Sequence, residues 1–256
     1  MRIGRDRFQN SMLYVVLFVS MSVLSLPRAM AVALRHDKDI TEAERIGVPF
    51  EAAGRVLPEG GCTLIAPTWV ITAAHVATSL PTGAYVQFGE RKFLVKRSII
   101  HPEGIAPRGQ PPEVDLALLE LAEPVTGIMQ VELNRAREEA GQTLYIVGYG
   151  DFGDPLSGFR HTDGKRRAVT NVVADVGPRR IFMVFNKPPK GTNFEGVGGP
   201  GDSGGPALLA RGGSVFLVGV SSASMNGRPG QHGVTDVYTR VSSYADWIDQ
   251  AMGRSN

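Results

Sequence analysis

The 256-residue chain has only one cysteine, Cys62, which excludes an intramolecular disulfide. It also contains no internal repeat, no low-complexity tract and no histidine or cysteine group spaced as zinc ligands. Stability must therefore come from a hydrophobic core, which a chain of this length with 43% apolar residues can form. Cys62 directly precedes an apolar run, so we expect a buried small residue there rather than a reactive thiol.

The chain also lacks an excess of one charge. Its formal net charge is +2, and the arginines of the first 33 residues account for that surplus, so the remainder is close to neutral. A near-neutral chain gives no reason to expect nucleic acid or an anionic membrane as a partner. We expect the run Lys165-Arg166-Arg167 on a solvated strand edge or loop, and His101, His161 and His232 at the surface.

The N-terminus has the features of an export signal. Arg2, Arg5 and Arg7 precede a nearly continuous apolar stretch from Met12 to Leu26, and Ala29, Ala31 and Ala33 then form two overlapping Ala-x-Ala patterns. A membrane anchor is the alternative, but the apolar stretch is shorter than the ~20 residues that a spanning helix needs. The pattern predicts a cleaved signal peptide over 1–33 and a secreted or periplasmic protein without a stable membrane anchor.

Turn residues are abundant, with 31 glycines and 17 prolines, and they separate short β-branched or aromatic runs. This pattern predicts an all-β fold with strands over 63–72, 84–88, 93–100, 116–121, 143–149, 165–176, 181–185, 206–209, 215–221 and 234–241. A closing helix is predicted over Ser242 to Met252, because Ala245, Ile248 and Met252 recur near the helical period.

Three short motifs in chain order point to nucleophilic chemistry: Thr72-Ala73-Ala74-His75, then Asp115-Leu116-Ala117-Leu118-Leu119, then Gly201-Asp202-Ser203-Gly204-Gly205-Pro206. A serine hydroxyl needs an imidazole to take its proton, and the imidazole needs a buried carboxylate to fix its tautomer. Ser203, His75 and Asp115 fit these roles. The surrounding glycines let the amides of Gly201 and Ser203 aim at one point, where each would stabilise an oxyanion by roughly 3 kcal/mol.

From about Gly60 onward, the chain resembles the chymotrypsin-like, trypsin-family serine proteases. Besides the triad motifs, the matching stretches are Leu64 to Val70, Ile99-Ile100-His101-Pro102, Val237 to Val241 and Tyr244 to Ile248. The resemblance implies two antiparallel six-stranded β-barrels, one over 34–136 with His75 and Asp115 and one over 137–256 with Ser203 and the closing helix. It also implies that Ser222 supports Asp115; the alternative is an ordinary polar strand residue.

Activation departs from the family's animal pattern, in which a freed Ile-Val-Gly-Gly terminus pairs with the aspartate before the serine. That aspartate is present as Asp202, but Ile-Val-Gly-Gly is absent. Signal cleavage after Ala33 would expose Leu34, which we expect to supply the activating ammonium. Cleavage at Arg45-Ile46 is the alternative, although it leaves a short path to His75.

The resemblance also indicates a substrate pocket formed by Val197, Ser224 and Asp236. Val197 replaces the acid that draws lysine or arginine in trypsin, but Asp236 at the rear wall could still meet a basic side chain, and Glu195 is another nearby acid. The alternative for Asp236 is a solvated or strand-capping carboxylate. Ser224 near the pocket mouth leaves a preference for small apolar residues open.

The resemblance implies a secreted serine endopeptidase that needs neither a metal nor an organic cofactor. Its expected partners are a protein or peptide substrate and a protein inhibitor. One alternative is a catalytically silent protein that keeps the fold for binding, whose usual mark is a lost triad residue. Another is a periplasmic protease-chaperone, which usually carries an added peptide-binding domain.

Overall fold

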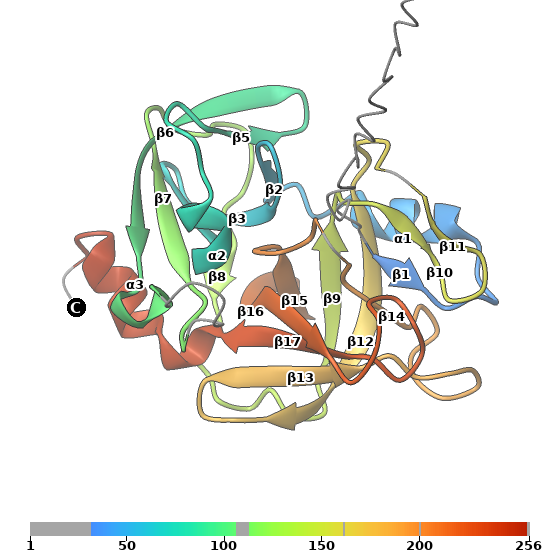
Figure 1. The fold of residues 1–256 in the computed structure, drawn as a ribbon. Coiled ribbons are helices and arrows are strands. Elements are labelled where there is room, and N and C mark those ends of the chain that lie inside the picture. The colour runs from blue at the N-terminus through green and yellow to red at the C-terminus, as the bar shows by residue number, and fades with distance from the viewer. Residues whose placement is uncertain (1–31, 106–112, 161, 200, 255–256) are drawn as a thin grey trace, which may run out of the picture.

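The computed structural model describes residues 32–105, 113–160, 162–199 and 201–254, and it has two β-barrels side by side (Figure 1). The first barrel is closed in the order β2-β3-β4-β7-β6-β5. Its strands are β2 (Ala53–Val56), β3 (Gly61–Ala66), β4 (Trp69–Thr72), β5 (Tyr85–Phe88), β6 (Arg91–Ile100) and β7 (Ala117–Leu121). The predicted run 63–72 is thus two strands, which turn at Pro67 and Thr68.

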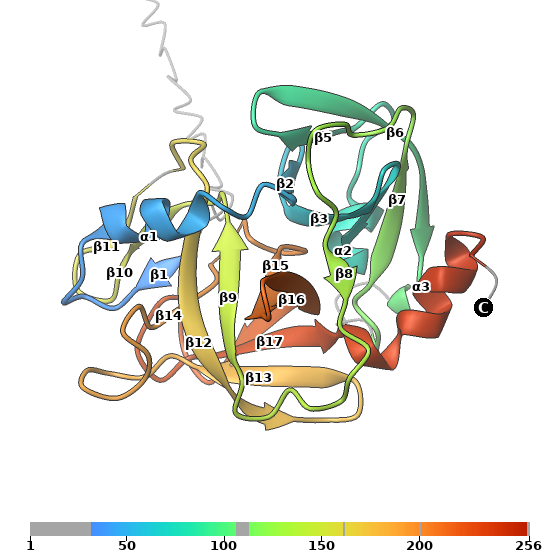
Figure 2. The ribbon, with the colours of Figure 1, turned by 180° about the vertical axis from the view of Figure 1, so that it is seen from behind.

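The second barrel is a ring in the order β15-β9-β12-β13-β17-β16, closed by pairing of β15 with β16. Its strands are β9 (Thr143–Gly148), β12 (Arg167–Val176), β13 (Arg180–Val184), β15 (Pro206–Arg211), β16 (Ser214–Met225) and β17 (Thr235–Arg240). The short strand β8 (Glu132–Leu133), in the segment that joins the barrels, pairs in parallel with β16 (Figure 2). The fold class predicted from the sequence, two six-stranded antiparallel barrels, is confirmed.

A small sheet beside the second barrel contains the beginning of the described chain. Its order is β11-β10-β1-β14, from β1 (Ala33–Leu34), β10 (Phe152–Asp154), β11 (Gly158–Arg160) and β14 (Gly196–Val197). Helix α1 (Ile40–Gly47) follows β1 and packs on β12. Residues 33–47 therefore lie against the second barrel, and the strands of the first barrel begin at Ala53.

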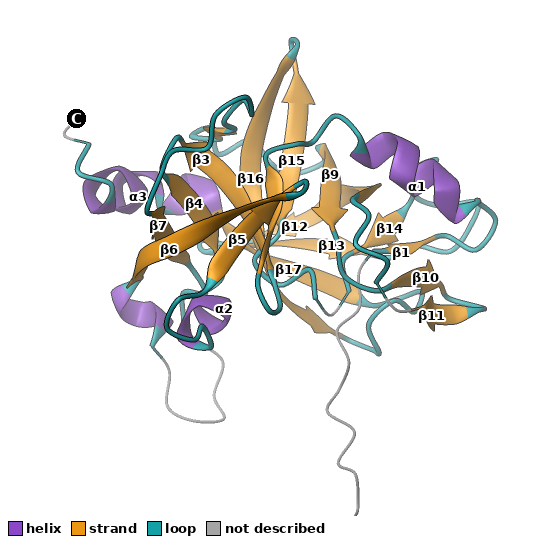
Figure 3. Cartoon of the chain, turned by 90° about the horizontal axis from the view of Figure 1, so that it is seen from above, coloured by secondary structure: helices purple, strands orange, loops and turns teal. Residues whose placement is uncertain are grey.

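The other helical elements are short: α2 (Ala74–Thr78), η1 (Pro102–Gly104), η2 (Val241–Ser243) and α3 (Ala245–Ala251). The predicted closing helix is α3, which lies at the opposite end of the molecule from α1 (Figure 3). Its Ile248 is fully buried in the same apolar cluster as residues from the strands of the first barrel. Helix α3 follows the last strand of the second barrel, so its packing joins the two barrels. No helix in the described ranges is both long enough and apolar enough to cross a bilayer.

Tight packing stabilises the segment next to the first motif. Val76 packs against Gly60, where a Cβ would lie 2.7 Å from a Val76 methyl group. Cys62 is fully buried as predicted, and burial raises the pKa of its thiol, so it is a core residue rather than a nucleophile.

The prediction of a solvated Lys165-Arg166-Arg167 run is wrong for Arg167, which is only 1% exposed. Its guanidinium donates to Asp163 and Glu44 and lies 3.6 Å from the ring centre of Phe152. Because carboxylates flank the guanidinium, the desolvation cost of burying this charge is offset. Arg167 thereby joins α1 to the second barrel.

Candidate active site

Strand pairing brings the predicted histidine and aspartate to one edge of the first barrel. Strands β4 and β7 pair with Thr72 opposite Ala117, so His75 and Asp115 both lie just beyond the same end of this pair. The His75 Nδ1 lies 2.7 Å from the Asp115 Oδ2, and the His75 amide donates to the Oδ1 at 3.0 Å. These two bonds orient the imidazole with its Nε2 free to face a substrate. The His75 side chain is 40% exposed, so a substrate can reach it.

Asp115 is itself held by groups from the second barrel. Ser222 Oγ donates to the Asp115 Oδ2 at 2.7 Å, so the hydrogen bond predicted for Ser222 is present. Thr239 Oγ1 donates to the Asp115 carbonyl at 2.9 Å, a contact that the sequence did not predict. Burial alone would raise the pKa of the Asp115 carboxyl, but hydrogen bonds from His75 and Ser222 outweigh it and lower that pKa. Asp115 therefore stays ionised at neutral pH.

Ser203 lies in the turn between β14 and β15, at the junction of the barrels. Gly201 and Gly204 on either side have φ of 95° and 83°, which favours glycine. The turn fits closely against the first barrel, since a Cβ at Gly204 would lie 2.1 Å from Thr72 Oγ1. The amide of Gly61 donates to the Ser203 carbonyl at 2.7 Å, which holds the serine turn against the start of β3.

The three residues predicted as a triad therefore lie at the junction of the two barrels. Within the described parts of the chain, the Ser203 hydroxyl makes no hydrogen bond to the His75 imidazole. In free enzymes this bond is often long and tightens only when substrate binds.

The Asp202 carboxylate points away from Ser203 into the second barrel. It accepts hydrogen bonds from the amides of Tyr149, Gly150 and Gly199 at 3.2, 3.2 and 3.3 Å. The space is so tight that a Cβ at Gly148 would lie 1.9 Å from its Oδ1. Burial raises the pKa of Asp202 to about 7, and among the described residues no cation forms an ion pair with it.

Strand β1 passes close to the segments that hold Asp202. Ala33 lies opposite Val197 and Leu34 opposite Gly196, and the amide of Gly153 donates to the Val32 carbonyl at 3.4 Å. Val32 and Ala33 are fully buried and Leu34 is 1% exposed. Leu34, expected from the sequence to be the mature terminus, is therefore the second residue of a buried strand. The predicted signal peptide over 1–33 falls almost wholly outside the described residues.

The predicted pocket residues lie together, on β14, β16 and β17. Asp236 is directly opposite Ser224 in the sheet and accepts a hydrogen bond from its hydroxyl at 2.9 Å. The other Asp236 oxygen accepts from the amide of Gly198, next to Val197, at 2.7 Å. Asp236 is 3% exposed, so the alternative of a solvated carboxylate is wrong, and burial raises its pKa to about 7.

Other residues singled out in the sequence lie elsewhere or have other contacts. Glu195 is fully buried. Its carboxylate accepts hydrogen bonds from Asn186 and Thr192, so it stabilises the loop between these residues and does not face the pocket. His232 is half-buried, with its Nε2 3.1 Å from the Nδ1 of His36, instead of lying free at the surface. His101 is partly buried against Tyr244 and Trp247, and His161 lies outside the described residues.

Comparisons with known proteins agree with this arrangement. The Trypsin family model matches residues 39–248, so the chain belongs to the trypsin family of serine proteases. Its fold is similar to that of neuropsin, a serine protease expressed in the limbic system of mouse brain, with a TM-score of 0.66 and 20% identity. That match covers 82% of this chain and 98% of neuropsin and shows the shared fold.

Three relatives show moderate sequence identity. Kallikrein-14 of Homo sapiens is 28% identical over 211 residues, covering 75% of this chain and 73% of the relative. Transmembrane protease serine 11E of Mus musculus is 28% identical over 218 residues, and vitamin K-dependent protein C of Oryctolagus cuniculus is 30% identical over 223 residues. These matches cover 75% and 73% of this chain but only 48% and 45% of those two proteins.

Proposed function

We propose that the protein is a secreted serine endopeptidase that works through an acyl-enzyme on Ser203. The carrying observation is the chain of contacts from Ser222 through Asp115 to the His75 imidazole, next to a glycine-bounded serine turn. Removal of the hydroxyl proton by His75 makes Ser203 a competent nucleophile. Because no triad residue is lost, a catalytically silent protein of the same fold is the less favoured alternative.

In the proposed reaction, the Ser203 Oγ attacks the peptide carbonyl carbon while its proton passes to the His75 Nε2. The amides of Gly201 and Ser203 stabilise the resulting oxyanion. Collapse breaks the C–N bond, the leaving amine takes the proton from His75, and an ester on Ser203 remains. Water then attacks that ester, with His75 as base, and releases the acid and the free serine.

A library of internally quenched peptides, incubated with the mature protein, tests this function. We expect cleavage within the peptides, a shared product pattern at one preferred residue, and no effect of metal chelation. Complete absence of cleavage by folded mature protein would instead support the silent alternative.

For activation, we propose that signal cleavage after Ala31, rather than after Ala33, creates the active terminus at Val32. Ala29-Met30-Ala31 is one of the two Ala-x-Ala patterns. Cleavage after Ala33 would remove two fully buried residues, and cleavage before Ile46 would remove β1 and cut α1. The 149–153 and 197–199 segments contact both β1 and Asp202, so an ammonium at Val32 would supply the cation that this buried carboxylate lacks.

Mass mapping of the secreted protein is therefore expected to find Val32 at the terminus. A form with one extra glycine before Val32 is expected to lose at least about tenfold in kcat/KM. The extra residue would disrupt the proposed charge-assisted interaction between the terminal ammonium and Asp202. A matched form that starts at Val32 but carries an extra glycine at the C-terminus is the control. Full activity in the N-terminally extended form would contradict this activation route.

For specificity, we propose that Asp236 draws a basic substrate side chain into the pocket. The carboxylate is buried, has two neutral donors and forms no ion pair among the described residues, so an entering guanidinium or ammonium would supply its counter-charge. Val197 contributes an apolar base along which the stem of a lysine or arginine can lie.

The preference for arginine over leucine at the cleaved residue is expected to rise with pH. With a pKa of about 7, the Asp236 carboxyl is mostly protonated at pH 6 and mostly ionised at pH 8. The ratio of kcat/KM values for the two substrates should therefore increase about tenfold over that interval. A ratio cancels pH effects common to both substrates, such as those of Asp202. Asp236→Asn should remove the pH dependence of this ratio, and Asp236→Ala should remove the preference for arginine. If both variants kept the wild-type ratio at every pH, Asp236 would not be the residue that selects basic side chains.

A further inference from the structure

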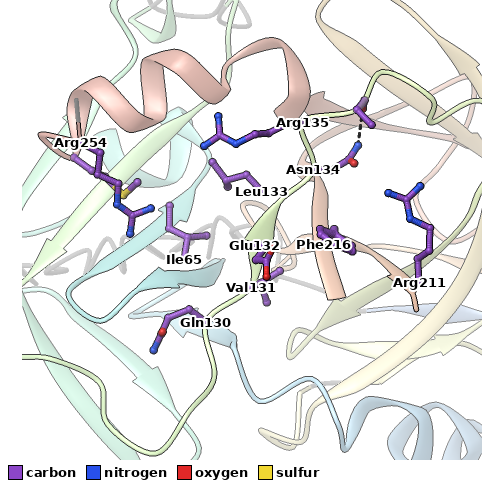
Figure 4. A pocket seen from close by; sticks show the side chains of 12 residues that line it. Ile65, Gln130, Val131, Glu132, Leu133, Asn134, Arg135, Arg211, Phe216 and Arg254 are labelled. Atoms are coloured by element: carbon purple, nitrogen blue, oxygen red, sulfur yellow. Dashed lines mark hydrogen bonds between the residues drawn. The ribbon is translucent and has the colours of Figure 1, made fainter. Parts of the chain in front are cut away.

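A large groove lies on the side of the molecule away from His75, where the segment that joins the barrels crosses between them. It has a volume of about 640 Å³ and is lined by Ile65, the joining residues 130–136, Arg211, Phe216, Met252 and Arg254 (Figure 4). Helix α2 and the tip of the β15–β16 hairpin, which carries Arg211, lie on opposite sides in Figure 3. A ligand in this groove would leave the triad accessible.

Three guanidiniums surround the groove. Arg135 donates to Asp249 at 2.6 Å and is neutralised, whereas Arg211 lies over the ring of Phe216 at 5.7 Å. Among the described residues, neither Arg211 nor Arg254 forms a side-chain ion pair. Glu132 is the one acidic residue of the lining. Two uncompensated arginines, next to one glutamate, give this end of the groove a surplus of positive charge.

A neighbouring hollow has several apolar residues in its lining, although Glu51 and Glu132 also border it. This hollow has a volume of about 200 Å³ and shares Gln130, Val131 and Glu132 with the first, so the two lie next to each other along the joining segment. Phe50, Leu208 and Val215 line it. Met129 stands at its edge with 89% of its surface exposed, which is unusual for a large apolar side chain.

We propose that this groove binds an extended segment of a partner protein in which an apolar side chain is followed by carboxylates. The apolar side chain fits the second hollow beside Met129, and the carboxylates meet Arg211 and Arg254, whose planar guanidiniums bind carboxylates with two parallel hydrogen bonds. A polyanion without apolar groups would leave the Met129 end unused. The chain's own leader does not fit, because Arg2, Arg5 and Arg7 would face the arginines.

Fluorescence anisotropy with Ser203→Ala protein tests this proposal without any dependence on catalysis. The probe is the peptide fluorescein-Leu-Phe-Gly-Glu-Glu-Glu-Glu, and its counterpart has glutamine in place of every glutamate. We expect saturable binding of the acidic peptide only. Arg211→Gln/Arg254→Gln should weaken it by about tenfold or more, and Met129→Ser should weaken it separately.

Lys92→Gln/Lys190→Gln is the matched control, because it removes the same charge from exposed sites outside the groove. It should leave the affinity unchanged, and thermal melts should show that all variants remain folded. Absence of saturable binding, equal binding of the glutamine peptide, or equal weakening in the control variant would overturn the proposal. The proposal would also be overturned if a sulfated oligosaccharide competed completely with the peptide and Met129→Ser had no effect on binding. Together, these two results would identify a purely polyanionic ligand.

Discussion

Replacing Ser203 with alanine is expected to lower kcat for peptide cleavage by about 10⁶-fold, the scale seen when a triad nucleophile is removed. In the proposed mechanism, this hydroxyl carries the acyl intermediate. Its removal leaves the backbone contact from Gly61 to the residue 203 carbonyl intact, because that bond uses main-chain atoms. The fold and the melting temperature should therefore be nearly unchanged.

The measurement is steady-state hydrolysis of the best library peptide by wild type and variant at matched concentration. The control variant is Ser221→Ala, which should retain most activity. Ser221 holds the turn through a hydrogen bond from its backbone amide to the Gly205 carbonyl, and this bond does not use the hydroxyl. Hydrolysis by folded Ser203→Ala protein at a rate near that of wild type would refute the assignment of the nucleophile.

Replacing Asp115 with asparagine is expected to lower kcat by about 10⁴-fold at neutral pH. The carboxylate accepts hydrogen bonds from both the His75 amide and the His75 Nδ1. An asparagine can present its NH₂ group to Nδ1, which selects the tautomer with the proton on Nε2 and leaves no base for Ser203. The side chain keeps its size, so its 4% exposed position should still pack.

Ser222→Ala is the informative companion, since it removes one hydrogen bond to Asp115 but leaves both His75 contacts. Its loss in kcat should be far smaller than that of Asp115→Asn, with a similar KM. Pre-steady-state rates of acylation and thermal melts would separate a catalytic defect from unfolding. Equal losses in the two variants would mean that Asp115 acts mainly through packing and not through the imidazole.

Much of the fold, and the contact between His75 and Asp115, could be predicted because the signals are local. Most strands of both barrels are β-branched runs bounded by turn residues, and His75 and Asp115 lie just beyond strand ends that the sheet brings together. Strands β1, β8, β10, β11 and β14 escaped prediction, because each has only two or three residues and exists through its neighbours. Strand β2 also escaped prediction, because Ala53-Gly54-Arg55-Val56 contains only one β-branched residue. Helix α1 did carry a signal, since Asp39 caps it by accepting from the Thr41 amide.

The errors concern burial and register, which depend on distant partners. Arg167 follows two other basic residues, yet Glu44 and Asp163 come from elsewhere to neutralise it in the interior. Glu195 has no sequence mark that separates a loop-fixing carboxylate from a pocket acid. The cleavage site proposed above between the two Ala-x-Ala patterns rests on the pairing of Ala33 with Val197, which no local pattern encodes.

Labelling with a fluorophosphonate tests the central claim most directly, because the reagent reacts only with a serine that has both an active base and a formed oxyanion site. Mature protein beginning at Val32 should become labelled stoichiometrically, with the modified peptide mapped by mass spectrometry to Ser203 and no label in Ser203→Ala. Absence of label in folded mature protein, or label at another residue, would contradict the proposed enzyme.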